Sequence, residues 1–393
     1  MSDRWSGIHR AERLVVSVRM DFLQQVYESD APFITVWADT THGTADARKQ
    51  AELRWRGLRL QLEAQGAGPG ELEALDQVVS PAPVAGDQSQ LLVSSGDRVL
   101  LSEHLAVRPG REVARRSALP DLMPWLVARD RSRHPPYLLV LVDRRGADIR
   151  VRAAPGRTDT VEVETDLYPI SKNAPGGWSQ RRYQRGVEEN WEHNAKQVAE
   201  TVEDLRRGYR PDAVIVSGDQ RARAALMERL PAASHDLAVE IGDLSRSPGV
   251  SEESLARHVD RVLDQRRHAD VDQVAQDYEF ARGRATAVDG LARVVTALAA
   301  GAVETLLVTE TTLDDTRAWV GSEPLWLALR REEVVTLGAR PDTVVPERAD
   351  AAMVRALVAT GGQLVAVEPD RLALRDGVGA MLRFPLSPAG AGP

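Results

Sequence analysis

The order of hydrophobic and polar residues predicts a mixed α/β protein, and the first third of the chain already shows both periods. Ala51, Trp55, Leu58 and Leu62 recur at helical spacing and predict an amphipathic helix that begins near residue 46. Glycines between 66 and 70 end this helix. The other elements expected here are strands at 32–37, 90–95 and 99–101 and a helix at 120–130.

A second section begins after residues 129–136, where charges and two consecutive prolines interrupt both periods. Residues 137–143 form an apolar strand, and the turn that follows leads back through 148–154 as a hairpin. The remaining elements expected are a strand at 161–165, a helix at about 181–207, a strand at 212–218 and a helix at 220–230. The long helix carries one apolar stripe, formed by Val187, Trp191, Ala195, Val198, Val202 and Leu205.

The last section alternates helices with short apolar strands, a pattern typical of a small α/β sandwich. A charged helix at 252–267 precedes it. The elements expected after that are helices at 287–300 and 349–359 and strands within 301–310, 363–368 and 376–384. Because 393 residues are too many for one ordinary core, the sequence predicts three domains, at 1–132, 133–268 and 269–393.

Composition excludes several kinds of site. The chain has no cysteine, which excludes disulfides, thiolate nucleophiles and cysteine-based metal centres. Its eight histidines never occur at the HxxxH spacing of a helical zinc site, so we expect no metal and no cofactor. No apolar run approaches the roughly 18 residues that span a bilayer. The N-terminus lacks an apolar signal core, so we expect a cytoplasmic protein with no membrane partner.

Residues 172–197 differ in composition from the rest of the chain. All three asparagines and two of the three lysines lie here, although arginine supplies almost all positive charge elsewhere. No acidic residue occurs between 171 and 185, in a chain whose formal net charge is -8. The positive charge of this segment comes from Lys172, Arg181, Arg182 and Arg185.

A Pro-Gly-Gly-Trp turn precedes three of these basic residues. Two adjacent glycines allow positive φ angles and hence a projecting loop. An aromatic ring beside arginines suits RNA, because the ring of Trp178 can stack on a base while the guanidinium groups bind phosphates. The alternative is that Trp178 packs against its own domain.

The same stretch resembles a known family. Residues 176–202 are similar to the Gly-Gly-Gln loop and following helix of archaeal and eukaryotic peptide-chain release factors and their Pelota-like relatives. The similarity continues in order through 137–151, 212–218, 298–310 and 376–384. The divergent first domain and the Trp-Ser-Gln-Arg-Arg variant look most like the bacterial members, the branch that includes the ribosome hibernation factor Balon and its actinobacterial relatives.

This resemblance implies a fold and a set of partners. The fold is α/β (α+β) in three domains: a divergent N-terminal α/β domain, an RNase H-like central domain with the GGWSQ loop, and an L30e-like α/β C-terminal domain. The implied protein is a monomer that occupies the A site of the 70S ribosome, reaches 23S rRNA near the peptidyl-transferase centre and pairs with elongation factor Tu. The rRNA-binding residues implied are Lys172, Gly176, Gly177, Trp178, Ser179, Gln180, Arg181, Arg182 and Arg185.

The sequence departs from the family at the residue that supports peptide release. Gly176 and Gly177 are kept, but Trp178 occupies the glutamine position and the nearest glutamine is Gln180. Such a displacement moves the hydrogen-bonding side chain by several ångströms relative to the reacting ester. The first domain also lacks the Asn and Cys of the eukaryotic codon-reading elements. We therefore expect a hibernation or stress factor without catalysis; the alternative is a rescue factor that hydrolyses peptidyl-tRNA with Gln180.

Three further motifs have more than one interpretation. Residues 217–220 (SGDQ) fit either a helix N-cap or a phosphate loop, and the cap is favoured. A literal Gly-Gly-Gln at 361–363 lies between a helix and a strand, which predicts a helix C-cap and turn. Asp143 ends the first central strand, and an RNase H-like domain makes a metal-dependent RNA nuclease the third candidate function. A hairpin turn also explains this aspartate.

Overall fold

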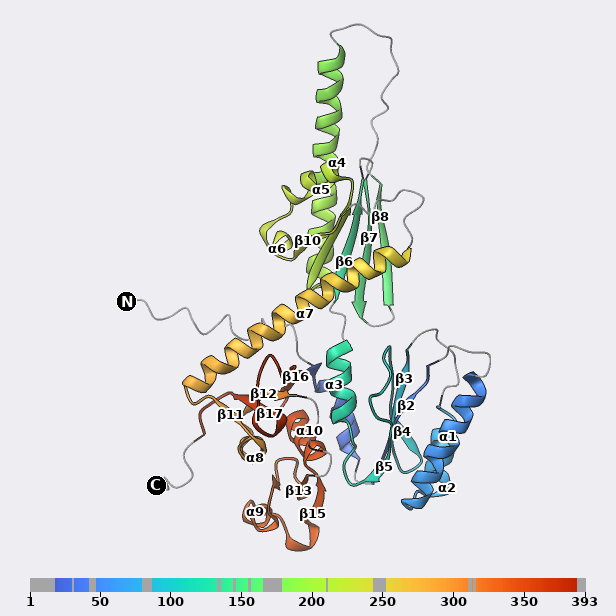
Figure 1. The fold of residues 1–393 in the computed structure, drawn as a ribbon, viewed down its shortest axis with the longest axis vertical. Helices are drawn as coiled ribbons and strands as arrows, with labels where there is room; N and C mark the ends of the chain where they lie inside the picture. The colour runs from blue at the N-terminus through green and yellow to red at the C-terminus, as the bar shows by residue number, and fades with distance from the viewer. Residues whose placement is uncertain are drawn as a thin grey trace. The chain divides into compact units, whose positions relative to one another are not determined.

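The computed structural model divides the chain into two compact units (Figure 1). Unit 1 combines Met1–Arg133 with Asp270–Pro393, and unit 2 is His134–Ala269. The expectation of a mixed α/β protein is confirmed, with four sheets among the described parts of the chain. The residues that the structure describes are 18–29, 32–41, 47–79, 87–132, 136–143, 146–154, 157–164, 179–209, 211–242, 252–309, 313 and 316–386.

Unit 2 is built on a five-stranded mixed sheet with the order β10-β9-β6-β7-β8. β6, β7 and β8 form an antiparallel meander, whereas β9 lies parallel to β6 and β10 lies parallel to β9. The parallel steps need crossover connections, and helices provide them. The strands are β6 (Tyr137–Val142), β7 (Gly146–Ala154), β8 (Arg157–Glu164), β9 (Ala213–Gly218) and β10 (Ala238–Glu240), and the helices are α4 (Ser179–Tyr209), α5 (Gln220–Met227) and α6 (Ala232–His235).

Both faces of this sheet are buried, which explains why β6 reads as a continuous apolar run. On one face, Leu138, Val140 and Val142 pack in a cluster with residues of α4 and α5. On the other face, Leu139 and Leu141 pack in a cluster with the first half of α7 (Glu252–Gly283). The strand period of two assigns alternate residues of β6 to the two clusters.

Unit 1 contains an antiparallel four-stranded sheet with the order β4-β3-β2-β5. One face of it packs against α1 and α2 through a cluster that includes Ile34, Leu58 and Leu62. This sheet and its helices contain the elements expected at 32–37, 90–101 and from residue 46. The elements are β2 (Phe33–Asp39), α1 (Ala47–Ala64), α2 (Pro69–Asp76), β3 (Ser89–Ser95), β4 (Arg98–Leu105), β5 (Val113–Ser117) and α3 (Met123–Ser132), and a 3-10 helix, η1, spans Asp21–Glu28.

The second large sheet of unit 1 has the order β1-β16-β12-β17-β11. The second half of α7 packs on one face, where Val274 and Tyr278 lie in a cluster with Leu307 and Val365. Helices α8 and α10 contribute to the main cluster of unit 1. The elements are β1 (Val18–Arg19), β11 (Ala287–Asp289), α8 (Leu291–Ala299), β12 (Val303–Val308), α10 (Ala349–Ala359), β16 (Gln363–Ala366) and β17 (Val378–Leu382).

The first and last parts of the chain share one core within unit 1. A single hydrophobic cluster contains Phe33, Trp125, Val294 and Leu364, from both parts. β1 pairs antiparallel with β16, and the Asp130 carboxylate accepts a hydrogen bond of 2.8 Å from the backbone N–H of Ala366. The division of the sequence into three domains stays a prediction.

Three local expectations are wrong in detail. Residues 287–289 form strand β11, paired with β17, and the helix begins only after Gly290, whose φ of +84° interrupts it. The charged helix expected at 252–267 continues to Gly283 as α7, and the helix expected at 220–230 ends at Met227 as α5. A small sheet with the order β14-β13-β15 was not expected at all. It consists of β13 (Arg317–Val320), β14 (Leu327–Ala328) and β15 (Val345–Arg348), with α9 (Arg331–Thr336) between β14 and β15.

We predict that Gly218→Ala destabilises unit 2 by at least about 3 kcal/mol. Gly218 ends β9 with φ +125°, and a Cβ there would lie 1.8 Å from the carbonyl oxygen of Val142. Gly208→Ala is the matched control, because a Cβ at this α4 position meets nothing within 4 Å. The control should stabilise slightly, by about 0.5 kcal/mol. Urea unfolding measures both changes, and equal stabilities would contradict the close approach.

Candidate functional site

The structure describes only part of the basic segment that the sequence singles out. Lys172, Gly176, Gly177 and Trp178 lie outside the described residues. The other residues of the predicted site lie in the first two turns of α4; they are Ser179, Gln180, Arg181, Arg182 and Arg185. That these residues bind rRNA stays a prediction.

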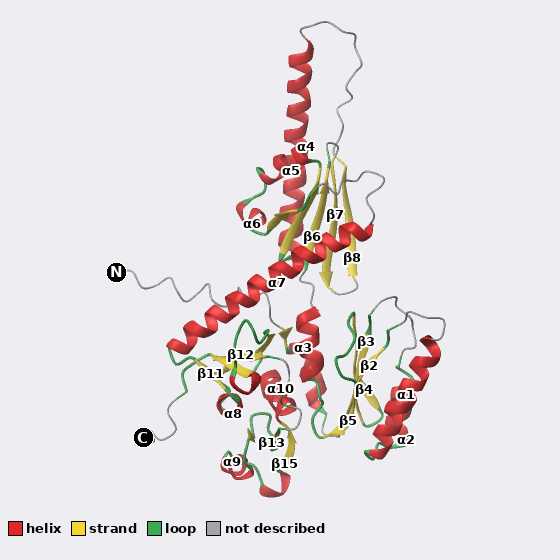
Figure 2. Cartoon of the chain, viewed as in Figure 1, coloured by secondary structure: helices red, strands yellow, loops and turns green. Residues whose placement is uncertain are grey.

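Helix α4 is held by its second half. Ala195, Val198, Ala199 and Val202 are buried in unit 2, where α4 contacts β7, α5 and α6. The first half extends beyond the edge of the sheet (Figure 2). At 1.5 Å per residue, the projecting turns from Ser179 to about residue 193 span about 20 Å. The helix therefore carries its first turn well away from the core of unit 2.

The projecting end of α4 is electropositive for two reasons. Its first turn contains no acidic residue, and three arginines follow within the first seven residues. The N-terminus of an α-helix also carries a partial positive charge, because its first backbone N–H groups have no partner within the helix. Arginine side chains and a helix N-terminus both favour phosphate groups.

A buried carboxylate fixes the anchored half of α4. The Glu203 Oε2 atom accepts hydrogen bonds from Ser234 Oγ at 2.7 Å and Arg206 Nε at 2.8 Å, and Oε1 accepts one from Arg207 Nε at 2.9 Å. Ser234 lies on α6, so the carboxylate ties the two helices together. The hydrogen bonds from Arg206 and Ser234 lower the pKa of Glu203 to about 2.

We predict that Glu203→Gln destabilises unit 2 by about 1–3 kcal/mol at pH 7, because the buried Ser234 hydroxyl and the two arginines lose a charged acceptor. The folded pKa of about 2 lies below the usual value of 4.5. The stabilisation by this carboxylate is therefore complete above about pH 5 and is lost as the pH falls towards 2.

Unfolding measured between pH 7 and pH 2 should show a smaller acid-induced loss of stability in Glu203→Gln than in the wild type. Glu200→Gln is the matched control on the same helix, because Glu200 is exposed and its ion pair with Lys196 is 3.9 Å long. Identical pH profiles for wild type and Glu203→Gln would contradict the assigned role.

The SGDQ segment is a helix cap. Asp219 precedes α5, and its side chain accepts hydrogen bonds from the backbone N–H groups of Arg221 at 3.0 Å and Ala222 at 3.2 Å. The carboxylate thus occupies the N–H groups that a phosphate would need. The N-cap interpretation is confirmed.

The literal Gly-Gly-Gln is a helix C-cap and turn, as predicted. Gly361 has φ +62°, and its N–H donates to Val358 O, while the N–H of Gly362 donates to Leu357 O at 2.9 Å. Gln363 begins β16 and pairs with Thr305 of β12. These bonds close the last turn of α10 and leave the three residues a structural role.

Asp143 follows β6, as the sequence indicates, in the described part of unit 2. Among the described residues, no group of three or more His, Asp or Glu side chains is close enough to hold a metal ion. None of the helices within that part of the chain is long and apolar enough to cross a bilayer.

A buried ionic cluster in unit 1 was not found from the sequence. Arg348 Nε donates to Asp350 at 2.9 Å and lies 3.7 Å from Asp121, and all three side chains are buried. Burial and the neighbouring Asp350 carboxylate raise the pKa of Asp121. Nearby, Glu347 accepts from the Ala118 backbone at 2.9 Å. The only signal in the sequence is a charged run that enters an apolar helix.

Comparison with known proteins assigns the chain to a family. Residues 136–284 match the bacterial archaeo-eukaryotic release factor family 2. Protein Rv2629 of Mycobacterium tuberculosis H37Rv is 32% identical over 374 residues, which cover 93% of this chain and 97% of that protein. The chain belongs to the bacterial archaeo-eukaryotic release factor family 2. The matched residues of this release-factor family include the whole of β6 to β10 and α4.

Solved structures of similar proteins include archaeal release-factor relatives. Pelota of Archaeoglobus fulgidus is 17% identical, with a TM-score of 0.36, and the match covers 76% of this chain and 80% of that one. A ribosome-bound archaeal Pelota is 18% identical, with a TM-score of 0.37 and coverage of 94% and 96%.

Proposed function

We propose that this protein is a ribosome-binding translation factor of the hibernation or stress-response type, which occupies the A site of the 70S ribosome and directs the start of α4 towards the peptidyl-transferase centre. In this proposal it acts by occupancy and does not hydrolyse peptidyl-tRNA. Its ligand is 23S rRNA, bound by the basic residues around the GGWSQ loop.

The observation that carries the proposal is the projecting, electropositive end of α4. Helix α4 is packed against unit 2 from Ala195 onwards, and its first turns, to which Arg181, Arg182 and Arg185 belong, extend beyond the sheet of unit 2. Ribosomal RNA offers a dense array of phosphates to the start of α4, where the chain is locally basic although its net charge is -8. Membership of a release-factor family supports the ribosome as the source of this RNA.

The topology of unit 2 supports the RNase H-like interpretation of this domain. Three antiparallel strands followed by two parallel strands, in the order β10-β9-β6-β7-β8, match the arrangement that the family resemblance implies. In that arrangement the Gly-Gly-Trp segment stands in the connection from β8 to α4, directly before the first turn of α4.

Two features support a function without catalysis. Trp178 stands where the release factors have glutamine, and an indole offers a single N–H donor and no acceptor for orienting water. The nearest glutamine, Gln180, belongs to the first turn of α4. Its place two residues after Trp178 displaces its side-chain amide from the position of the release-factor glutamine, whereas water activation needs a donor placed at the reacting ester.

The resemblance to the branch that includes Balon suggests elongation factor Tu as a second partner, and we include it in the proposal.

We predict that replacing Arg181, Arg182 and Arg185 together by alanine weakens binding of the full chain to vacant 70S ribosomes at least about tenfold, because phosphate contacts are lost. Sedimentation at several salt concentrations measures it. The slope of log affinity against log salt should fall by about two, since each lost contact removes about 0.7 to 0.9. Trp178→Ala should also weaken binding to the ribosome, but the slope of log affinity against log salt should stay unchanged, because the indole carries no charge.

The matched control removes the same charge elsewhere in unit 2. Arg221, Arg257 and Arg261 are exposed on α5 and α7, and their joint replacement by alanine should leave ribosome binding within about twofold of wild type. Equal loss in both triple variants would show that net charge, and not the tip, governs binding and would reject the proposal.

A release assay separates silencing from rescue. We predict that the wild type, added to stalled ribosomes that carry labelled peptidyl-tRNA, releases no more peptide than buffer does. Replacement of Gln180 by alanine should leave that background unchanged. Release by the wild type that disappears in Gln180→Ala would instead establish the hydrolytic alternative.

A further inference from the structure

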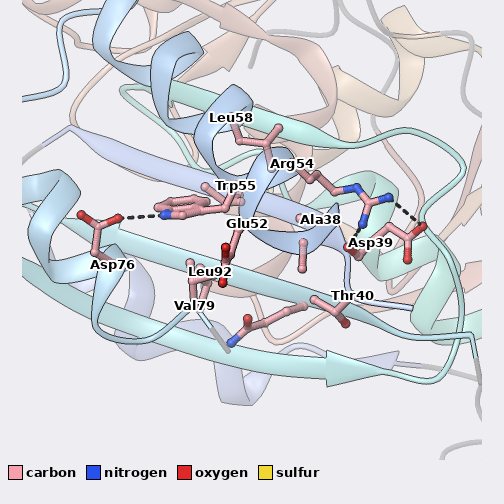
Figure 3. A pocket seen from close by; sticks show the side chains of 13 residues that line it. Ala38, Asp39, Thr40, Glu52, Arg54, Trp55, Leu58, Asp76, Val79 and Leu92 are labelled. Atoms are coloured by element: carbon pink, nitrogen blue, oxygen red, sulfur yellow. Dashed lines mark hydrogen bonds and ion pairs between the residues drawn. The ribbon is translucent and has the colours of Figure 1, made fainter. Parts of the chain in front are cut away.

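Unit 1 contains a pocket that lies between the four-stranded sheet and the helices that cover it (Figure 3). Its volume is about 150 Å³. Val36 and Leu92 of the sheet line one side, and Trp55 and Leu58 of α1 line the other. A cavity of about 150 Å³ accommodates one benzene ring. The pocket therefore fits a ligand whose apolar part is a single ring or a short branched chain.

The indole of Trp55 is held as a fixed wall of the pocket. Its Nε1 atom donates a hydrogen bond of 2.7 Å to Asp76 Oδ1, as Figure 3 shows. Asp76 also lies 3.4 Å from Arg59 Nε, so its negative charge is compensated. Because the indole edge is tied to α2, the face of the ring is available to a ligand.

The polar residues at the opposite end of the pocket satisfy one another. Arg54 donates to the Asp39 carbonyl oxygen at 2.8 Å and pairs with Glu112 at 3.1 Å. Burial raises the pKa of Asp39, but hydrogen bonds from Thr41 and the charge of Arg54 outweigh it, and the net shift is downward. The amide of Gln90 donates to the Val78 carbonyl oxygen at 3.1 Å. These groups shape the site and are already engaged.

Glu52 differs from the other polar residues of the pocket. It is an exposed residue of α1, one turn before Trp55, and its side chain lines the pocket where the pocket meets solvent. Within the part of the chain that the structure describes, no hydrogen bond or ion pair of its carboxylate is present. A carboxylate without a protein partner attracts a cation by direct charge, and an indole that lines the same pocket adds the attraction of its ring quadrupole.

We propose that this pocket binds a small organic cation, an amine carried on a ring-sized apolar group. The apolar part fills the space between Trp55 and Leu92, and the ammonium group donates hydrogen bonds to Glu52. The proposal concerns unit 1 and does not depend on ribosome binding by the start of α4, so each can fail without the other.

The test is calorimetric titration of the full chain with 2-phenylethylamine, a cation of the expected size. Toluene and 3-phenylpropanoate, similar in shape but neutral and anionic, are the comparison ligands. The amine should bind with a Kd of about 1 mM or tighter, which is modest for a ligand of this size. Toluene should bind more weakly, and the anion should not bind detectably.

Two variants locate the binding. Glu52→Gln keeps the shape of the pocket and removes the charge, so it should weaken amine binding at least about fivefold and leave toluene binding unchanged. Ala51→Leu keeps a strong helix former on α1 and fills the pocket, so it should abolish binding of both ligands. Glu73→Gln is the matched control, because Glu73 is exposed on α2 and does not line the pocket.

The proposal is overturned by any of three results. The first is that the wild type does not bind 2-phenylethylamine. The second is that it binds 2-phenylethylamine and 3-phenylpropanoate equally well. The third is that Ala51→Leu binds the amine as the wild type does. Circular dichroism of each variant establishes that it is folded. If Ala51→Leu does not fold, the ratio of amine to toluene affinity in Glu52→Gln decides the matter alone.

Discussion

The anchoring of α4 on the sheet of unit 2 is the contact on which the proposed function depends. Small and branched side chains between Ala195 and Val202 fill the space against β7, and Glu203 joins α4 to α6 through Ser234. A helix fixed at one end behaves as a lever arm, so any tilt at the anchor is multiplied at the start of the helix. The hydrogen bond between Ser234 and Glu203 opposes such a tilt, because it joins α4 to α6.

Unit 1 is built from two stretches of chain, Met1–Arg133 and Asp270–Pro393, that are far apart in sequence. Apolar packing supplies most of the contact, but burial of Arg348, Asp350 and Asp121 adds directional bonds at its centre. Buried ion pairs contribute little net stability, because desolvation offsets their attraction. They do penalise misaligned packing, since a charge left without its partner is costly. We infer that this cluster sets the register between the two stretches.

Regular elements with strong periods could be predicted from the sequence. The apolar run of residues in β6, the apolar stripe along α4 and the glycine C-cap after α10 follow from local patterns that tertiary contacts reinforce. The small sheet around β13 could not be predicted, because strands of two to four residues carry no period. The length of α7 was missed because its buried face changes partner, from a cluster with Val259 to one with Val274.

The candidate sites show the same division between local and long-range information. The basic residues before and within α4 form one contiguous segment, which composition alone reveals. The pocket beside Trp55 draws on residues from 36 to 92 that only the folded sheet brings together. The helical spacing in the sequence marks Trp55 as part of an apolar stripe, but no local pattern indicates that Glu52 lines a pocket.

The insertion of unit 2 within unit 1 affects the order in which the protein can fold during synthesis. All of the strands of unit 2 emerge before the last strand of unit 1, and β17 lies between β12 and β11 in its sheet. Unit 2 can therefore complete its core while the chain is still being made. In the five-stranded sheet of unit 1, β11 and β12 lack their shared neighbour β17 until residue 382 is made. From residue 308 to residue 382, the nascent chain therefore carries β11 and β12 without the strand that joins them. An unpaired sheet edge can pair with another chain, so unit 1 is exposed to such pairing during this interval.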